Sequence, residues 1–168
     1  AVRDAGVVVF MANVSLFGEW TFILLITAVI ACGLFIGKHR AEAAGLLTAV
    51  FGSTIVVLAL KFLVARPRPD VYFRVVNETG SSFPSAHAAL SVAFCGFLVY
   101  LVCRFTHNTT LRRGALFLGL ALPLLIGFSR LYLGVHYLSD VVGGFAIGAV
   151  FLWLGITVTK RIKNPKVS

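Results

Sequence analysis

The chain has 168 residues, of which 59% are hydrophobic, and its mean hydropathy is +0.96. An ordinary soluble domain is far less apolar, so the composition excludes that class and indicates a membrane protein. Fifteen Lys and Arg against six Asp and Glu give a net charge of +9, but the cations cluster in short gaps between apolar runs, which argues against a nucleic-acid partner.

Five apolar runs have about the length that a helix needs to cross a bilayer. They are residues 20–37, 43–60, 88–103, 114–129 and 141–159. Residues 5–18 are uncharged but shorter, so we expect an interfacial segment or the end of a helix that begins upstream. No linker or repeat divides the sequence. We therefore predict an all-α transmembrane bundle that forms one domain over residues 1–168.

Several smaller features refine this bundle. Gly144 and Gly148 are four residues apart, a spacing that predicts a close contact with another helix. Pro123 is compatible with a kink inside a helical bundle. The three cysteines lie inside apolar runs without a metal-binding spacing, so we predict small core residues. The sequence begins at Ala1 without the layout of a signal peptide, so we expect it to be part of a longer protein.

The segment between the second and third runs, residues 65–85, is polar and rich in proline. Pro84 and Ser85 directly precede an apolar run, which predicts the start of a helix. The free N–H groups and the positive dipole end of such a helix favour phosphate. His87 would lie in its first turn. Arg66 and Arg74 are predicted to contact solvent or lipid headgroups.

The segment between the fourth and fifth runs contains Arg130, His136 and Asp140. If residues 136–140 open a helix, the i,i+4 spacing places the histidine and the carboxylate on one face. The carboxylate would then fix the imidazole tautomer and leave the other ring nitrogen free to attack or to exchange a proton. Arg130 would offer a planar donor fork to an oxyanion.

Because successive spans alternate in direction, the charged residues fall into two sets at opposite ends. The larger basic set is predicted to be cytoplasmic: Lys38, Arg40, Arg104, Arg112, Arg113, Lys160, Arg161, Lys163 and Lys166. The other set is predicted to be extracytoplasmic: Arg3, Lys61, Arg66, Arg68, Arg74, His87, Arg130, His136 and Asp140. The residues with unusual chemistry therefore gather at one face.

Three cations of this face, Lys61, Arg68 and Arg130, are sufficient to hold a phosphate group and to stabilise further charge in a transition state. By themselves, the first two would be typical of snorkelling residues at a membrane edge. Together with His136 as nucleophile and His87 as general acid, they suit phosphoryl transfer.

The motifs Lys61-x6-Arg68-Pro69, Pro84-Ser85-x-His87 and Ser129-Arg130-x5-His136-x3-Asp140 resemble the three signature motifs of the type 2 phosphatidic acid phosphatase (PAP2) superfamily. The resemblance covers about residues 20–160. It implies an integral-membrane lipid phosphatase with a six-helix core, a phosphohistidine intermediate and no metal or other cofactor. Five of the six spans are visible, and the first family helix is expected upstream of Ala1.

The resemblance also implies a role for each motif residue. The catalytic residues would be His136 as nucleophile, His87 as general acid and Asp140 as the partner of His136. The phosphate-binding residues would be Lys61, Arg68, Ser85, Ala86 and Arg130. Ala86 stands where the family usually has glycine, and at the start of a helix we expect alanine to preserve activity.

Alternative functions are a phosphate-headgroup binder or lipid-flipping protein without turnover, and a lipid phosphotransferase. A binder would need only the cations, so the two histidines and the aspartate favour an enzyme. The related soluble haloperoxidases share the motifs but lack five apolar runs, which excludes them. Phosphatidic acid, phosphatidylglycerophosphate and polyprenyl diphosphates such as undecaprenyl diphosphate all remain compatible substrates.

Overall fold

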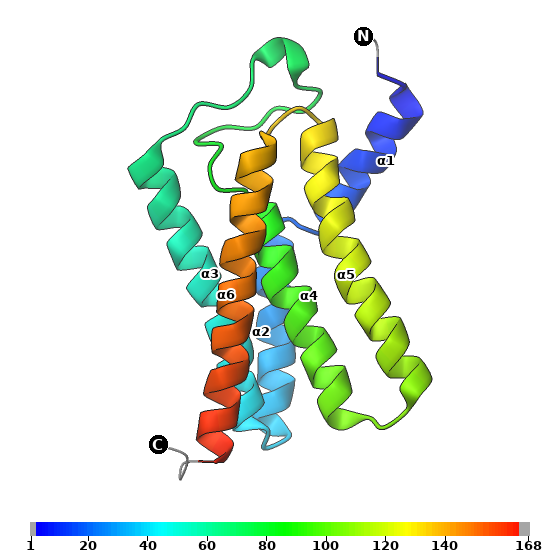
Figure 1. The fold of residues 1–168 in the computed structure, drawn as a ribbon, viewed down its shortest axis with the longest axis vertical. Helices are drawn as coiled ribbons and strands as arrows, with labels where there is room; N and C mark the ends of the chain where they lie inside the picture. The colour runs from blue at the N-terminus through cyan, green and yellow to red at the C-terminus, as the bar shows by residue number, and fades with distance from the viewer. Residues whose placement is uncertain (1–2, 165–168) are drawn as a thin grey trace.

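A computed structural model describes residues 3–164. This part of the chain forms a bundle of α-helices and contains no strand (Figure 1). The elements are α1 (Ala5–Leu16), α2 (Trp20–Ile36), α3 (Arg40–Val64), the short 3-10 helix η1 (Val71–Phe73), α4 (Ala86–Phe105), α5 (Thr109–Tyr132) and α6 (Leu138–Lys163). Five stretches are long and apolar enough to cross a membrane, the first being α1 and α2 together. The predicted all-α transmembrane bundle is confirmed.

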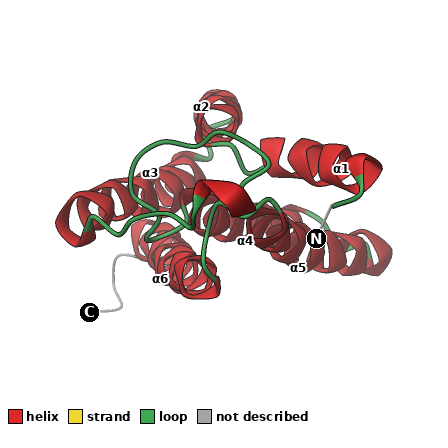
Figure 2. Ribbon diagram, turned by 90° about the horizontal axis from the view of Figure 1, so that it is seen from above, coloured by secondary structure: helices red, strands yellow, loops and turns green. Residues whose placement is uncertain are grey.

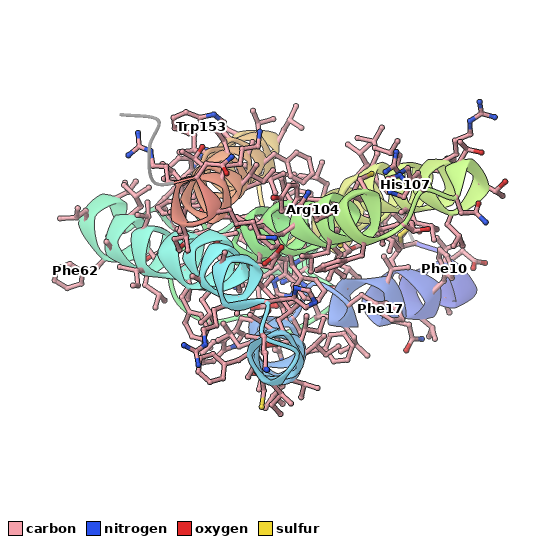
Figure 3. The ribbon with its side chains drawn as sticks, turned by 90° about the horizontal axis from the view of Figure 1, so that it is seen from below. Phe10, Phe17, Phe62, Arg104, His107 and Trp153 are labelled. Atoms are coloured by element: carbon pink, nitrogen blue, oxygen red, sulfur yellow. The ribbon has the colours of Figure 1, made fainter. Side chains whose placement is uncertain are left out.

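Large apolar side chains point outward from this bundle, as Phe62 and Trp153 do in Figure 3. Their exposed fractions are 85% and 64%. In a bilayer such side chains face lipid tails, which are as apolar as they are. Cys32 is also exposed, so the prediction that it is a core residue is wrong. An apolar run does not reveal which face of a helix is packed.

The helices continue beyond the apolar runs that predicted them. α3 extends to Val64 and α5 extends to Tyr132. Lys61 and Arg130 therefore lie in the last turns of these helices, where a cation is favoured by the helix dipole. The apolar runs were shorter than the helices because each run ends at the first charged residue, whereas a helix can continue through such a residue.

α4 lies in the middle of the bundle and packs against α2, α3, α5 and α6 (Figure 2). The buried core between α3 and α4 contains Leu46, Ala49, Val50, Leu90 and Phe97. Because this central helix is fixed on several sides, its first residues have a well-defined position at the end of the bundle.

The predicted close contact at Gly144 and Gly148 is confirmed and lies between α6 and α4. A Cβ atom added to these glycines would lie 2.5 Å from the Ser85 carbonyl oxygen and 2.4 Å from that of Ala89. At the same end, the Ser85 N–H donates to the Asp140 carbonyl oxygen over 3.0 Å. Glycine therefore brings the start of α4 against the start of α6, which places the second and third motifs side by side.

Residues 65–85 cross the end of the bundle and carry η1 at their tip (Figure 1). At this end α1 packs along α5 and is separated from α2 by a turn at residues 17–19 (Figure 2). α1 is thus part of the cover of this end. Of the charged residues predicted for the opposite end, Lys166 lies outside the described residues.

Candidate active site

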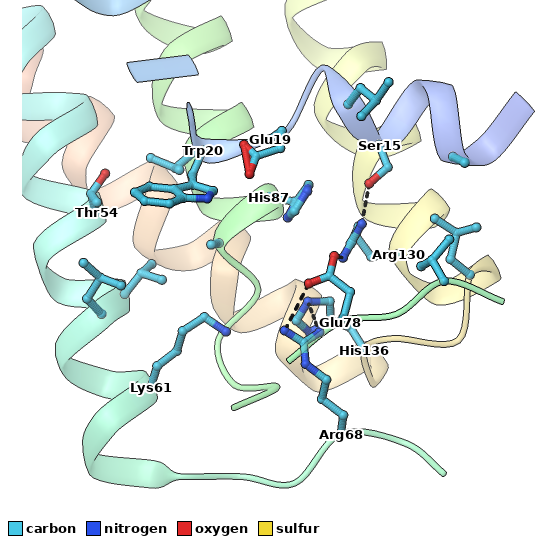
Figure 4. A pocket seen from close by; sticks show the side chains of 18 residues that line it. Ser15, Glu19, Trp20, Thr54, Lys61, Arg68, Glu78, His87, Arg130 and His136 are labelled. Carbon is cyan, nitrogen blue, oxygen red and sulfur yellow. Dashed lines mark hydrogen bonds and ion pairs between the residues drawn. The ribbon is translucent and has the colours of Figure 1, made fainter. Parts of the chain in front are cut away.

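One cavity of about 400 Å³ lies at the end of the bundle that carries residues 65–85 (Figure 4). The predicted site residues that line it are Lys61, Arg68, Ala86, His87, Arg130 and His136. Ser85 and Asp140 do not line the cavity but directly adjoin residues that do. The structure thus brings the three motifs to one place, and both histidines face the same cavity.

His136 lies in the turn before α6, because the helix begins at Leu138. The expectation that residues 136–140 form one helical turn is therefore wrong. Instead, the Asp140 carboxylate folds back over the helix start: Oδ2 accepts the Tyr137 N–H over 2.8 Å and lies 3.4 Å from His136 Nδ1. His136 Nε2 lies 3.5 Å from Arg68 Nη1. The carboxylate thus faces one ring nitrogen and leaves the other toward the cations.

The His136 imidazole is buried, with an exposed fraction of 5%. Burial lowers the pKa of His136 to about 2, with further lowering by the guanidinium groups of Arg130 and Arg68. Both effects disfavour the imidazolium because it would be a buried charge beside other positive charges. The side chain is therefore neutral at pH 7, which is the state that a nucleophile requires.

Lys61 and Arg68 hold the loop that covers the cavity. Lys61 Nζ donates to the Ser81 carbonyl oxygen over 2.6 Å. Arg68 donates to the carbonyl oxygens of Thr79, Gly80 and Val135 over 3.0, 3.1 and 3.1 Å. Both side chains are consequently fixed before any ligand binds, so an anion in the cavity meets preorganised charge.

Glu78 is a residue of this site that sequence reasoning missed. Its carboxylate forms an ion pair with Arg130 and lies 3.5 Å from Arg68 Nη2 (Figure 4). A second Arg130 nitrogen donates to the Ser15 hydroxyl of α1, and Arg130 Nε is buried without a hydrogen-bond partner. A carboxylate between two guanidinium groups marks a position that suits an anion.

The start of α4 forms another side of the cavity. Ser85 is the N-cap, and its hydroxyl accepts the Ala88 N–H over 3.5 Å. Its own N–H donates to the Asp140 carbonyl oxygen. Ala86 and His87 follow, and their N–H groups have no intrahelical acceptor. Ala86 is the first helical residue and needs no positive φ.

Arg66 was predicted to contact solvent or lipid headgroups, but its guanidinium contacts other residues of the protein. Arg66 Nη1 donates to Asp140 Oδ1 over 2.8 Å and to the Ser139 hydroxyl over 2.7 Å. The partners are 74 and 73 residues away in the chain. No local pattern reveals such a contact. The first motif gives no signal either, because Arg66 is one of its unspecified residues between Lys61 and Arg68.

Beyond the charged groups, the cavity wall is apolar. This part of the lining includes Leu16 of α1, Trp20 of α2, Val57 and Leu58 of α3, and Leu90 of α4. A molecule with an anionic group and a hydrocarbon portion would match both ends of such a cavity.

Comparison with known proteins agrees with this geometry. The sequence profile of the PAP2 superfamily matches residues 42–163. Phosphatidylglycerophosphatase B of Bacillus subtilis is 31% identical over 156 residues, which cover 92% of this chain and 76% of the relative. Decaprenylphosphoryl-5-phosphoribose phosphatase of Mycobacterium tuberculosis is 34% identical over 155 residues, which cover 88% of this chain and 78% of the relative.

The fold has a close match among solved structures. The crystal structure of a transmembrane PAP2-type phosphatidylglycerolphosphate phosphatase from Bacillus subtilis superposes with a TM-score of 0.86 at 26% identity. The match covers 97% of this chain and 81% of that one. The chain therefore belongs to the PAP2 superfamily, in its integral-membrane lipid phosphatase branch.

Proposed function

We propose that this membrane protein hydrolyses a lipid phosphate or diphosphate at the extracytoplasmic face, through a phosphohistidine formed on His136. The observation that carries the proposal is that Lys61, Arg68 and Arg130 line the same cavity as His87 and His136. The apolar wall of the same cavity supports a substrate with a lipid tail. A soluble phosphate ester would gain nothing from that wall.

In the first step, His136 Nε2 attacks the phosphorus atom and the bond to the lipid oxygen breaks. His87 donates a proton to the leaving oxygen, so the lipid leaves as an alcohol, or as a monophosphate if the substrate is a diphosphate. In the second step, a water molecule attacks the phosphohistidine and His87 takes its proton. The products are inorganic phosphate and the regenerated imidazole.

The three cations have the electrostatic role in both steps. Charge on the transferred group spreads over its equatorial oxygens in the transition state. The fixed guanidinium groups of Arg68 and Arg130 and the Lys61 ammonium would stabilise that charge without reorganisation. Glu78 occupies the position between the two arginines, so substrate binding requires its carboxylate to move aside.

The relatives support the substrate class. One is named for phosphatidylglycerophosphate and another for a decaprenyl-linked phosphate ester. Both named compounds have a lipid tail and a phosphate group, but the kind of tail differs. We therefore propose the class as substrate, with phosphatidic acid, phosphatidylglycerophosphate and undecaprenyl diphosphate as the test compounds.

The proposed side of the membrane follows from charge asymmetry. The end opposite the cavity carries the larger basic set, including Arg104, Arg112 and Lys163. Basic residues next to short loops favour the cytoplasmic side. The cavity then opens to the extracytoplasmic side, where an impermeant lipid-phosphate analogue added to intact cells would be hydrolysed.

The decisive test is phosphate release from these three lipids by purified protein in detergent with EDTA. We expect turnover by the wild type and loss of turnover in His136→Ala. His107→Ala is a matched control because His107 is exposed at the opposite end, and this variant should retain activity. Lipid binding without phosphate release by the wild type would indicate a binder or flipping protein, and strict dependence on a divalent ion would contradict the mechanism.

The intermediate can be tested separately with lipid substrate labelled at the phosphate. Acid-labile, alkali-stable label on the protein is expected in a rapid quench and should be absent in His136→Ala. Adding a small alcohol distinguishes a transferase, because the label would then appear in a new phosphate ester instead of inorganic phosphate.

A further inference from the structure

Arg66 connects the loop over the cavity to the carboxylate beside His136. Its Nη1 atom donates to Asp140 Oδ1 over 2.8 Å. The Asp140 side chain has no exposed surface, whereas that of Arg66 is 35% exposed. Arg66 does not line the cavity, so any effect on the reaction must pass through another residue.

The Asp140 carboxylate divides its two oxygens between two tasks. Oδ2 accepts the Tyr137 N–H and lies 3.4 Å from His136 Nδ1. Oδ1 accepts the hydrogen bond from Arg66. Without that donor, Oδ1 would be a buried charged oxygen with no side-chain partner, and the carboxylate would rotate to share its oxygens differently. The contact with Arg66 therefore fixes which oxygen faces the imidazole.

Arg66 is itself held from three directions. Its guanidinium lies 4.2 Å from the centroid of the Tyr137 ring, within the range of a cation–π contact. Its Nη1 atom also donates to the Ser139 hydroxyl, and its carbonyl oxygen accepts the Ser82 N–H over 2.9 Å. A partly exposed arginine with these contacts has a single favoured position, which is what a positioning group requires.

We propose that Arg66 is a positioning residue for catalysis: by holding Asp140 Oδ1, it keeps Oδ2 toward His136 Nδ1 and so aims His136 Nε2 at the phosphorus atom. The inference rests on the proposed function. Arg66 should affect the rate of the chemical step and not phosphate binding, because it makes no contact inside the phosphate-binding cavity.

The first test compares kcat and KM for Arg66→Ala and Arg66→Lys in detergent. We expect kcat to fall by about tenfold to a hundredfold in Arg66→Ala, by analogy with the loss when an outer partner of a metal-bound histidine is removed. KM and inhibition by vanadate should change by less than about twofold. Arg66→Lys should recover part of the rate because it retains one donor. An unchanged kcat, or a loss confined to KM and vanadate binding, would overturn the inference.

A double-mutant cycle tests whether Arg66 acts through Asp140. Asp140→Asn should lower kcat by itself, and Arg66→Ala should add little in that background, because the group that it positions is already impaired. Losses that multiply in the double variant would show that Arg66 acts by another route and would overturn the inference.

A structural role must be separated from a positioning role. Guanidinium added to Arg66→Ala should restore part of kcat, because the vacated site is partly open to solvent. Arg161→Ala is the matched control, since Arg161 is exposed at the other end of the bundle, and guanidinium should leave its rate unchanged. If Arg66→Ala does not fold, the inference is tested on Arg66→Met, which has no hydrogen-bond donor, and a full rate in this variant when folded refutes it.

The test of Arg66 can fail independently of the test of the proposed function. If His136→Ala retains turnover, the proposed mechanism fails whatever Arg66 does. If His136→Ala is inactive and Arg66→Ala retains a full kcat, the proposed mechanism stands and this inference fails.

Discussion

The two ends of the bundle both contain a buried carboxylate that pairs with cations, yet their chemistry differs. At the end opposite the cavity, shown in Figure 3, Glu42 of α3 is fully buried. It pairs with Lys163 of α6 and lies 3.9 Å from Arg104 of α4. This contact ties three helices together.

At the cavity end, the balance of charge is different. Lys61, Arg68 and Arg130 all line the cavity. Within residues 3–164, Glu78 is the one carboxylate that forms ion pairs with Arg68 and Arg130. Arg130 Nε is buried without a hydrogen-bond partner. Positive charge and an unpaired donor therefore remain beside the cavity.

The comparison teaches that a buried ion pair does not by itself mark a functional site. Glu42 resembles Asp140 in its burial, and its partners Lys163 and Arg104 are partly exposed. The cavity end instead has three cations in the wall of one cavity, which suits a site that accepts an anion.

The largest effect is expected from removing a cation at the cavity end. Arg130→Ala should lower kcat/KM by about a hundredfold or more, as expected when a fixed donor to developing charge is lost. Arg104→Ala at the opposite end should change kcat/KM by less than about twofold. Steady-state phosphate release measures both. Equal losses in the two variants would remove the distinction between the ends.

A smaller effect with the opposite sign is expected from Glu78→Gln. The carboxylate competes with a bound anion for Arg130 and Arg68, so removing its charge should tighten inhibition by vanadate about tenfold, or about 1.4 kcal/mol. Glu19→Gln is the matched control, because Glu19 lines the same cavity but accepts the Thr21 N–H. Weaker vanadate inhibition in Glu78→Gln would show that Glu78 helps to bind the anion.

The opposite end should respond in stability and not in rate. Lys163→Met leaves the buried Glu42 charge without its nearest cation, but Arg104 remains close to it, so the free energy of unfolding should fall by about 1 kcal/mol. Thermal unfolding in detergent measures this change, and activity at low temperature should be retained. Adding Glu42→Gln should recover part of the loss. A loss of kcat in the folded single variant would argue against a purely structural pair.

The smallest effect is expected for His136, which should not titrate near its usual pKa. Because burial and the nearby guanidinium groups lower the pKa of His136 to about 2, its imidazole should stay neutral between pH 8 and about pH 5. In the unfolded chain it would bind a proton near pH 6.5, so this residue contributes less stability as the pH falls below that value. Nitrogen NMR of labelled histidine can follow it, and a midpoint near 6.5 would contradict the argument.

The membrane class, the five spans and the three motifs were predictable from the sequence, because each depends on residues that are close together in the chain. Hydropathy over about 20 residues determines whether a helix can span a bilayer. The close contact of α6 was predictable for the same reason, because Gly144 and Gly148 are close together in the chain. Helix ends were less predictable: uncharged runs ended before Lys61 and Arg130, although the helices continue through both residues.

The geometry around the motifs depended on tertiary structure. His136 and Asp140 are close because the carboxylate folds back over the start of α6, and not through a helical turn. The contacts of Arg66 with Asp140, Glu78 with Arg130 and Ser15 with Arg130 join residues 74, 52 and 115 positions apart.

The sequence alone therefore determined what kind of chain this is and which motif residues to examine. Only the tertiary structure decided which oxygen of Asp140 faces His136, and that Glu78 lies between two cations of the cavity. Helix formation and membrane insertion follow from local composition, whereas these contacts depend on the path of residues 65–85 over the end of the bundle. That path leaves no periodic pattern in the sequence.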